Sequence, residues 1–381
     1  MRVAVIGAGV LGASTAFHLA LSGAEVVVAD QAHPGRATAA GAGIVSPWAS
    51  SRTDPFWYRI AAAGARYYPA LIGLLAEAGE TDTGYRRVGA LCVAAEAVEL
   101  DRIEAMVRAR RAEAPEAGEV SRLSPAEARA LFPPLHPTLG AVHVSGGARV
   151  DGRLLAAALR RAAERRGVRF LDGAAGLLAE GGRVRGIRVG AETLAADRVV
   201  VAAGAWAPAL LGPLGVALSV APQRGQITHL RLEGVETGGW PIVLPPGSHY
   251  LLAFDDSRVV VGATRETGSG FDNRVTAAGQ AEVLNQALAV APGLGPATLL
   301  ETRVGFRPMG PDLRPMLGRI PGWEGLVVGN GLGPSGLTIG PFAGRLLAQL
   351  ALGEAPELDL APYDPLRPAS PGGGEEADAI R

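Results

Sequence analysis

The first thirty residues constrain the fold more than any other stretch of the chain. The sequence there is MRVAVIGAGVLGASTAFHLALSGAEVVVAD, in which an apolar run, a glycine-rich turn, a helical pattern and a second apolar run follow one another. The glycines of the turn are Gly7, Gly9 and Gly12, and Asp30 ends the second apolar run. This order predicts a buried strand, a tight turn, a helix and a parallel second strand.

Each part of this motif has a physical role in binding a dinucleotide. Gly7 permits the tight turn, Gly9 lets a pyrophosphate approach the backbone, and Gly12 lets the helix pack closely on the sheet. The helix N-terminus offers free N–H groups and a partial positive charge to phosphates. Asp30 stands where a carboxylate accepts hydrogen bonds from a ribose hydroxyl. A dinucleotide site is therefore predicted. FAD and NAD both remain open here, as does a glycine turn without a ligand.

Composition narrows the class of protein further. A chain of 381 residues predicts two domains, and 48% hydrophobic with 19% charged residues is typical of a globular enzyme. The net charge of −1 gives no general case for nucleic acid or an anionic membrane. A single cysteine, Cys92, excludes an internal disulfide and cysteine-based metal centres, and the histidines show no metal-ligand spacing. Glycines interrupt each long apolar run, so we expect no transmembrane segment. We also expect no metal site, and the single cysteine fits a reducing compartment, so a cytoplasmic location is expected.

All 36 basic residues are arginine, so the sequence contains no lysine. A genome rich in G and C is the simplest reason for this bias. The chemical consequence is independent of the reason, because no lysine Schiff base can form. Pyridoxal-phosphate enzymes and lysine aldolases are therefore excluded.

The pattern of elements alternates between two types along the chain. Strand and helix patterns of the α/β type occupy three separated segments, whereas the segments between them are first helical and then rich in β-hairpins. The predicted fold class is therefore α/β: an interleaved Rossmann-like nucleotide-binding domain with an α+β second domain that has a largely antiparallel sheet. The nucleotide-binding domain is assigned residues 1–50, 138–215 and 305–365, the second domain 51–137 and 216–304, and a disordered tail 366–381.

Six motifs occur in the same order as in one known family. They are GAGVLG with Asp30, RATAAGAGI, VVVAAGAW, PQRGQ, ETRVGFRP and GNGLGPSGLTIGP. Over about residues 1–360 the chain resembles the D-amino-acid oxidase-like FAD oxidoreductases, which include glycine oxidase, monomeric sarcosine oxidase and bacterial D-amino-acid dehydrogenases. The resemblance implies that the second domain binds the substrate.

The resemblance implies FAD rather than NAD. Gly7, Gly9 and Gly12 would hold the pyrophosphate, and Asp30 the adenosine ribose. The last glycine loop opens a helix, whose N–H groups suit negative charge on a reduced flavin. The further residues that the resemblance places beside FAD are Thr38, Ala39, Gly43 and Ile44 along the phosphates and flavin, Ala174 at the adenine, Gly204 and Trp206 near the dinucleotide, and Gly331, Gly333, Ser335, Gly336, Leu337 and Thr338 at the pyrimidine side of the flavin.

Two residues are implied at the substrate. Arg307 in ETRVGFRP matches the arginine that binds the substrate carboxylate, which a planar guanidinium meets with two hydrogen bonds. Tyr250 stands where related glycine oxidases have a tyrosine that donates to the same carboxylate. A structural ion pair and a sheet aromatic are the alternatives for these two residues. His249 is the weaker candidate, because adjacent strand residues point to opposite faces.

The sequence departs from the family pattern at two points, which lead to expectations about the attachment of FAD and about the electron acceptor. Some sarcosine oxidases attach FAD through a cysteine near the segment that holds Arg307, and no cysteine occurs there, so FAD is expected to be non-covalent. Sarcosine oxidases also use a lysine over the flavin for reaction with oxygen. Its absence slightly favours a dehydrogenase, which would pass electrons to a quinone or a protein carrier instead of oxygen.

The implied reaction is FAD-dependent oxidation of an amino acid, either a D-amino acid or a glycine-like substrate. A hydride would pass from Cα to flavin N5, and the resulting imine would hydrolyse to a 2-oxo acid. Orientation and flavin electrostatics would suffice for this chemistry without a general base. The alternatives are oxidation of a secondary amine such as sarcosine or proline, oxidation of a 2-hydroxy acid, and a flavin subunit of a hetero-oligomeric dehydrogenase.

Overall fold

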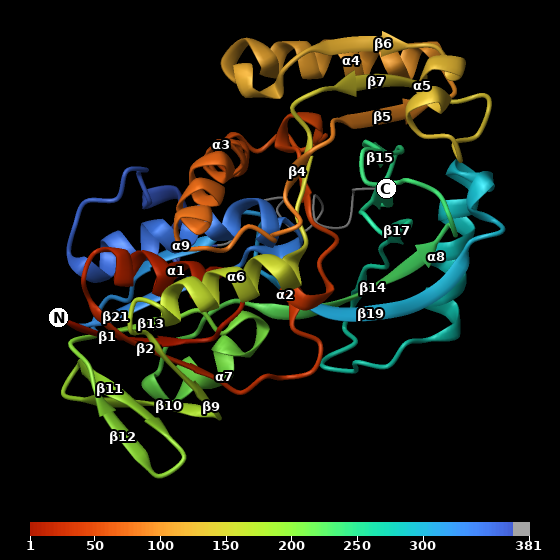
Figure 1. Cartoon of the computed structure of the whole chain (residues 1–381). Coiled ribbons are helices and arrows are strands. Elements are labelled where there is room, and N and C mark those ends of the chain that lie inside the picture. The colour runs from red at the N-terminus through yellow and green to blue at the C-terminus, as the bar shows by residue number, and fades with distance from the viewer. Residues whose placement is uncertain (369–381) are drawn as a thin grey trace.

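The computed structural model describes residues 1–368, and a six-stranded sheet lies at the lower left of Figure 1. Three of its strands, Arg2–Ile6, Arg198–Val201 and Leu326–Asn330, are largely apolar and buried on both faces, as parallel strands between two covering layers are. The sheet confirms the predicted parallel pairing of the first two strands. Its order is β20 (Met316–Arg319), β21 (Leu326–Asn330), β13 (Arg198–Val201), β1 (Arg2–Ile6), β2 (Glu25–Asp30) and β9 (Arg169–Asp172), with β20 alone antiparallel.

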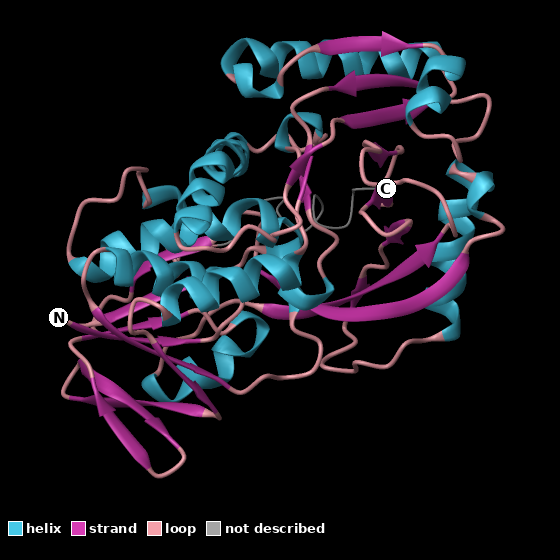
Figure 2. Cartoon of the chain, in the orientation of Figure 1, coloured by secondary structure: helices cyan, strands magenta, loops and turns pink. Residues whose placement is uncertain are grey.

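Different layers cover the two faces of this sheet (Figures 1 and 2). Alternate residues of β1 separate them: Val3 and Val5 pack in one hydrophobic cluster, and Ala4 and Ile6 in the other. The first cluster involves the helices α1 (Val10–Leu21), α3 (Pro55–Glu77), α6 (Gly152–Glu164) and α9 (Gly336–Leu352). The second involves α7 (Ala207–Leu211) and a small sheet of β10 (Ala175–Glu180), β11 (Arg183–Val189) and β12 (Glu192–Ala195).

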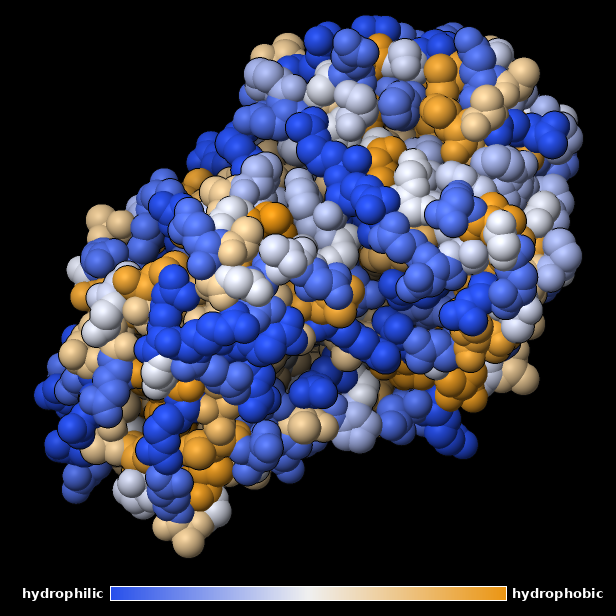
Figure 3. Space-filling model, viewed as in Figure 1, coloured by the Kyte–Doolittle hydropathy of each residue, from blue (hydrophilic) through white to orange (hydrophobic). Residues whose placement is uncertain are grey.

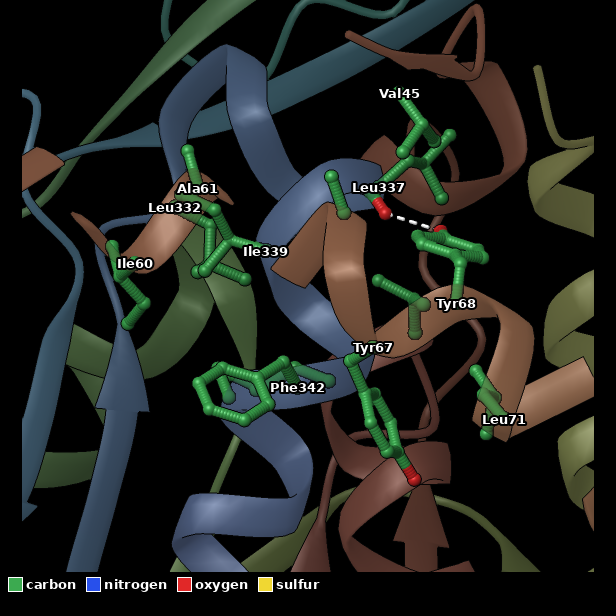
Figure 4. Packing of buried hydrophobic residues seen from close by; sticks show 14 of the residues in the cluster. Val45, Ile60, Ala61, Tyr67, Tyr68, Leu71, Leu332, Leu337, Ile339 and Phe342 are labelled. Atoms are coloured by element: carbon green, nitrogen blue, oxygen red, sulfur yellow. Dashed lines mark hydrogen bonds between the residues drawn. The ribbon is translucent and has the colours of Figure 1, made fainter. Parts of the chain in front are cut away.

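The helices α3 and α9 cross at close range in the core (Figure 4). The hydroxyl of Tyr68 on α3 donates a hydrogen bond to the carbonyl of Leu337, at the start of α9. A Cβ atom at Gly64 would lie 2.4 Å from the carbonyl oxygen of Thr338, so this crossing requires glycine there. The contact fixes the N-terminus of α9, which matters below because that end faces a cavity.

A second, nine-stranded sheet forms the other half of the molecule, and it is largely antiparallel. The long strands β14 and β19 pair along most of their length and reach back toward the first sheet (Figure 1). The sheet order is β18 (Glu266–Thr267), β14 (Ala221–Arg231), β17 (Arg258–Gly262), β16 (Tyr250–Ala253), β15 (Ile242–Leu244), β5 (Ala90–Ala94), β7 (Gly140–Val144) and β6 (Val120–Leu123), with β19 (Thr298–Met309) also paired to β14.

Three helices cover this second sheet. The helix α4 (Ala97–Glu113) packs on β5 and β7, and α5 (Pro125–Leu131) also contacts β7. The helix α8 (Ala277–Val290) packs on β14 and β17. A small three-stranded sheet of β3 (Ile44–Val45), β8 (Ala148–Arg149) and β4 (Arg86–Arg87) completes the described strands. The predicted fold class is thereby confirmed.

A strand pairing and a helix contact cross the predicted division of the chain. The strand β7 falls in a segment assigned to the nucleotide-binding domain, yet it pairs with β5 and β6 of the second sheet. The helix α3 falls in a segment assigned to the second domain, yet it packs on α9. An apolar pattern identifies a strand or a helix but not its distant partner, so the division itself stays a prediction.

Residues 369–381 of the predicted disordered tail lie outside the described residues. Within the first part of that segment, Arg367 forms an ion pair with Asp312 at 2.5 Å and donates to the carbonyl of Pro315 at 3.1 Å. Among residues 1–368, no helix is both long and apolar enough to cross a membrane. The face seen in Figure 3 intersperses apolar residues with hydrophilic ones.

Candidate active site

A cavity of about 550 Å³ is lined by residues of both large sheets. Its walls come from the glycine turn after β1, the loop that follows β2, the strands β14, β16 and β19, and the glycine loop before α9. A cavity of this size, where the carboxyl ends of parallel strands meet a second sheet, is where α/β proteins bind ligands.

The glycine turn has the geometry that its sequence predicts. Gly7 has φ +104°, and a Cβ atom there would lie 2.4 Å from the carbonyl oxygen of Ala202. A Cβ at Gly12 would lie 1.9 Å from the carbonyl oxygen of Gly7, so this glycine lets α1 begin directly against the turn. Gly7 and Gly9 line the cavity, whereas Gly12 lies behind them.

Asp30 lines the same end of the cavity and organises the loops around it. One carboxylate oxygen accepts the Ala8 N–H at 2.6 Å, and the other accepts the Ala32 N–H at 2.6 Å. Arg36 lies 3.5 Å from the second oxygen. Backbone donors thus fix the orientation of the only carboxylate among the residues that line the cavity.

The N-termini of two helices, α1 and α9, face the cavity. The N-cap residues Gly9 of α1 and Ser335 of α9 make no side-chain cap, and neither helix has an acidic residue in its first turn. Thr38 accepts the Val10 N–H at 3.0 Å, and the other N–H groups of the first turns have no intrahelical acceptor. Both ends therefore suit negative charge, such as that of a pyrophosphate or of a reduced flavin, so the residues present fit FAD.

Most of the other residues predicted beside FAD also line the cavity. They are Thr38, Gly43, Ile44, Gly204, Trp206, Gly333, Gly336 and Leu337. Gly43 has an additional structural reason to be glycine, because its φ is +97° and a Cβ atom would lie 1.7 Å from the carbonyl oxygen of Val150.

Five predicted residues lie outside the cavity wall in addition to Gly12: Ala39, Ala174, Gly331, Ser335 and Thr338. Gly173 and Ala175 line the cavity in place of the residue between them. Ser335 accepts hydrogen bonds from the side chains of Arg52 and Trp57, which holds the loop before α9. Thr338 donates to the carbonyl of Ile44 at 2.9 Å, so it ties α9 to that wall.

Arg307 and Tyr250 line the cavity together, from β19 and β16. The Nη1 of Arg307 donates to the carbonyl of Thr264 at 3.0 Å and to Oε1 of Gln223 at 3.3 Å. A Cβ atom at Gly225 would lie 2.5 Å from Nη2, so the guanidinium lies directly over this glycine. In the register of β14 and β19, Arg307 pairs with Gln223 and Gly225 pairs with Gly305, so the guanidinium reaches diagonally across the strand pair to Gly225.

Electrostatics couple these two side chains. Burial lowers the pKa of Arg307, and Tyr250 opposes that shift. Burial raises the pKa of Tyr250, and the nearby guanidinium groups oppose it. At neutral pH the pair is therefore a cation beside a protonated hydroxyl, and both groups can donate to a carboxylate.

The sequence prediction missed Arg265, a third side chain at this end of the cavity. It lies three residues after β17, and β17 pairs Gly262 with Tyr250. Its Nε and Nη1 are buried without a hydrogen-bond partner among the described residues. No local pattern signals this position, because it depends on the register of the hairpin between β16 and β17.

The prediction also missed an aromatic stack on Trp206. His33 stacks on one side with ring centroids 4.5 Å apart, and Phe271 stacks with centroids 5.1 Å apart. His249, the weaker candidate, does not line the cavity and lies 3.5 Å from Glu282. Cys92 is also away from the cavity wall, and burial raises the pKa of its thiol to about 12.

Comparisons with known proteins agree with this geometry. The chain matches the model of a family described as FAD dependent oxidoreductase over residues 2–350. A crystal structure of iminodiacetate oxidase from Chelativorans sp. BNC1 is 56% identical, with a TM-score of 0.94 and coverage of 96% of this chain and 99% of that one.

Two sequence relatives extend the comparison. An uncharacterized oxidoreductase of Bacillus subtilis, YurR, is 52% identical over 95% of this chain and 97% of its own length. Glycine oxidase of Pseudomonas aeruginosa is 33% identical over 96% of this chain and 98% of its own length. The resemblance noted in the motifs is confirmed, and the chain belongs to the family of FAD dependent oxidoreductases.

Proposed function

We propose that this protein oxidises an amine whose oxidisable carbon carries a carboxylate, as in glycine or an N-substituted glycine. The observation that carries the proposal is the position of Arg307, which lies over Gly225 beside Tyr250 in the wall of the cavity. A fixed guanidinium next to a hydroxyl donor matches a carboxylate in charge and in hydrogen-bond geometry.

Under this proposal, one set of residues around the cavity binds FAD and another set binds the substrate. The glycine turn, Asp30 and the N-termini of α1 and α9 would hold FAD, which supplies the acceptor for two electrons when bound. Arg307 and Tyr250 would hold the carboxylate and so fix which carbon is oxidised. The amine would lose two electrons and two protons to give an imine. Water would then hydrolyse the imine to a 2-oxo acid and the released amine.

The protein supplies no evident base at the substrate end. The only lining carboxylate is Asp30, and its backbone partners hold it at the glycine turn. The substrate amine would therefore react in its neutral form, and the cationic Arg307 favours that form by repelling an ammonium group. Rate would depend on orientation rather than on proton abstraction by a side chain.

The name of one relative favours a secondary amine within this class. The 56% identical structure is that of an iminodiacetate oxidase, whereas the glycine oxidase is 33% identical. A secondary amine with an N-carboxymethyl group is therefore our second candidate beside a primary amino acid. A panel of glycine, sarcosine, iminodiacetate, proline and D- and L-amino acids, scored by anaerobic loss of oxidised flavin absorbance, ranks the two candidates.

The electron acceptor is a separate part of the proposal. We retain the slight preference for a dehydrogenase on one observation, the absence of lysine from the sequence. Mixing the reduced protein with air-saturated buffer tests it: slow reoxidation supports a dehydrogenase, and rapid peroxide formation contradicts it. Flavin reduction by substrate in the isolated chain would also count against the need for a partner subunit.

A further inference from the structure

Arg265 occupies the same end of the cavity as Arg307 and Tyr250. It follows β17 at the point where Gly262 pairs with Tyr250 on β16. The residue before it, Thr264, provides the carbonyl that holds Arg307 at 3.0 Å. Two guanidinium groups are thus anchored to one short stretch of backbone and line one cavity.

The charge of Arg265 has no counter-ion among the described residues. Its Nε and Nη1 are buried without a partner, although a buried donor of this kind costs free energy when it is left unpaired. Its neighbour Arg307 repels it, and burial together with that repulsion lowers the pKa of Arg265 to about 10, so it remains charged at neutral pH. Like charges placed in one cavity predict an anionic ligand.

The nearest carboxylate in the sequence, Glu266, is already engaged. It forms an ion pair with Arg224 at 2.5 Å, and it accepts hydrogen bonds from Gln226 at 2.8 Å and Thr264 at 2.7 Å. It also acts on Arg307 through space, where it opposes the effect of burial on the pKa. It does not pair with Arg265, whose donors remain available to a ligand.

We propose that Arg265 binds a second carboxylate, so that the protein selects amines that carry two carboxylates, as iminodiacetate does. This inference rests on the proposed function, in which Arg307 binds the carboxylate at the carbon that is oxidised. The second carboxylate belongs to the other substituent of the amine. Each guanidinium then has its own anion, and the repulsion between Arg265 and Arg307 is offset by two ion pairs.

A pair of ligands without an oxidisable amine tests binding apart from turnover. Thiodiacetate carries two carboxylates around a sulfur atom, and (methylthio)acetate carries one. Dissociation constants are measured from the change that each ligand causes in the flavin spectrum of the holoenzyme, and FAD retention is measured in the same samples. The wild type is expected to bind thiodiacetate tighter, on the order of tenfold to a hundredfold.

Variants of Arg265 test whether this side chain causes the preference for thiodiacetate over (methylthio)acetate. Arg265→Met is expected to abolish the preference while (methylthio)acetate binding stays within about twofold. Arg265→Lys keeps the positive charge but loses the planar guanidinium, so it should retain part of the preference for thiodiacetate. This variant replaces Arg265→Met in the test if the methionine variant does not fold. The control is Arg129→Met on the exposed face of α5, which removes the same charge away from the cavity and should leave both constants unchanged.

Three results would overturn the inference. They are equal binding of the two ligands by the wild type, equal weakening of both by Arg265→Met, and loss of FAD from Arg265→Met, which would make this arginine a cofactor residue. Failure of the proposed function has a different signature. In that case Arg307→Met would leave (methylthio)acetate binding unchanged, whatever Arg265→Met does.

Discussion

At the scale of single residues, the site is a set of donors fixed by backbone geometry. Arg307 owes its position to Gly225 across the strand pair and to the Thr264 carbonyl, rather than to a carboxylate partner. The motif that contains Arg307 was recognisable in the sequence, and so was Asp30 after its strand. Arg265 was not, because its proximity to Tyr250 depends on a hairpin register that no local pattern specifies.

The position of Tyr250 predicts how its replacement would change substrate binding. Replacing it by phenylalanine removes the hydroxyl that is proposed to donate to the carboxylate and leaves the ring that packs in the sheet. The dissociation constant of the substrate should rise about fivefold to tenfold, and the limiting rate of flavin reduction should change little. Stopped-flow reduction over a range of substrate concentrations separates the two quantities. A large fall in the limiting rate with unchanged binding would instead give the hydroxyl a role in the chemical step.

At the scale of elements, local signals were predicted well and distant pairings were not. The side chains of Asp54, Ser124 and Asp151 cap α3, α5 and α6 by accepting backbone N–H groups two or three residues away, so such a cap can be recognised from the local sequence. The partner of β7 could not be predicted, because pairing with β5 depends on the whole sheet. The same applies to the crossing of α3 and α9.

A buried histidine in the contact between α1 and α3 predicts how the stability of the fold depends on pH. His18 on α1 lies 2.5 Å from the Tyr67 hydroxyl on α3, and burial lowers the pKa of this histidine to about 4. An ordinary histidine has a pKa of about 6.5 in the unfolded chain, so the unfolded state binds more protons between these values. Stability is therefore complete above about pH 6.5 and is lost as the pH falls toward 4.

The prediction is tested by comparing the wild type with His18→Gln, because glutamine keeps a polar group that does not titrate. Between about pH 7.5 and pH 5 the wild type should lose about 2 kcal/mol of unfolding free energy from this group. The variant should lose correspondingly less over the same interval, as measured by denaturant unfolding of the holoenzyme. Parallel pH profiles of the two proteins would contradict the prediction. Arg129→Gln is a suitable control for a surface change.

At the scale of the whole molecule, two sheets built from interleaved segments enclose one cavity. The glycine turn at the start of the chain and the loop before α9 lie far apart in sequence, yet both line this cavity. The motifs predicted this convergence because each ends a strand of the same parallel sheet. The shape of the substrate end could not be predicted, because β14, β16 and β19 create it only after they pair.

At this scale, we also predict that FAD is bound without a covalent link to the chain. Its single cysteine, Cys92, is buried in the second sheet and does not line the cavity. Acid precipitation should therefore release the flavin into the supernatant. Yellow colour retained by the washed pellet would show a covalent link. Mass spectrometry of the denatured chain gives the same answer independently.

The central claim is that Arg307 binds the carboxylate of the substrate beside FAD. The direct measurement is the rate of anaerobic flavin reduction by the best substrate of the panel, compared between the wild type and Arg307→Ala. With FAD content equal, we predict a loss of about a hundredfold in the second-order rate constant, because two charge-assisted hydrogen bonds are removed. An unchanged rate constant in a variant that retains its FAD would contradict the account.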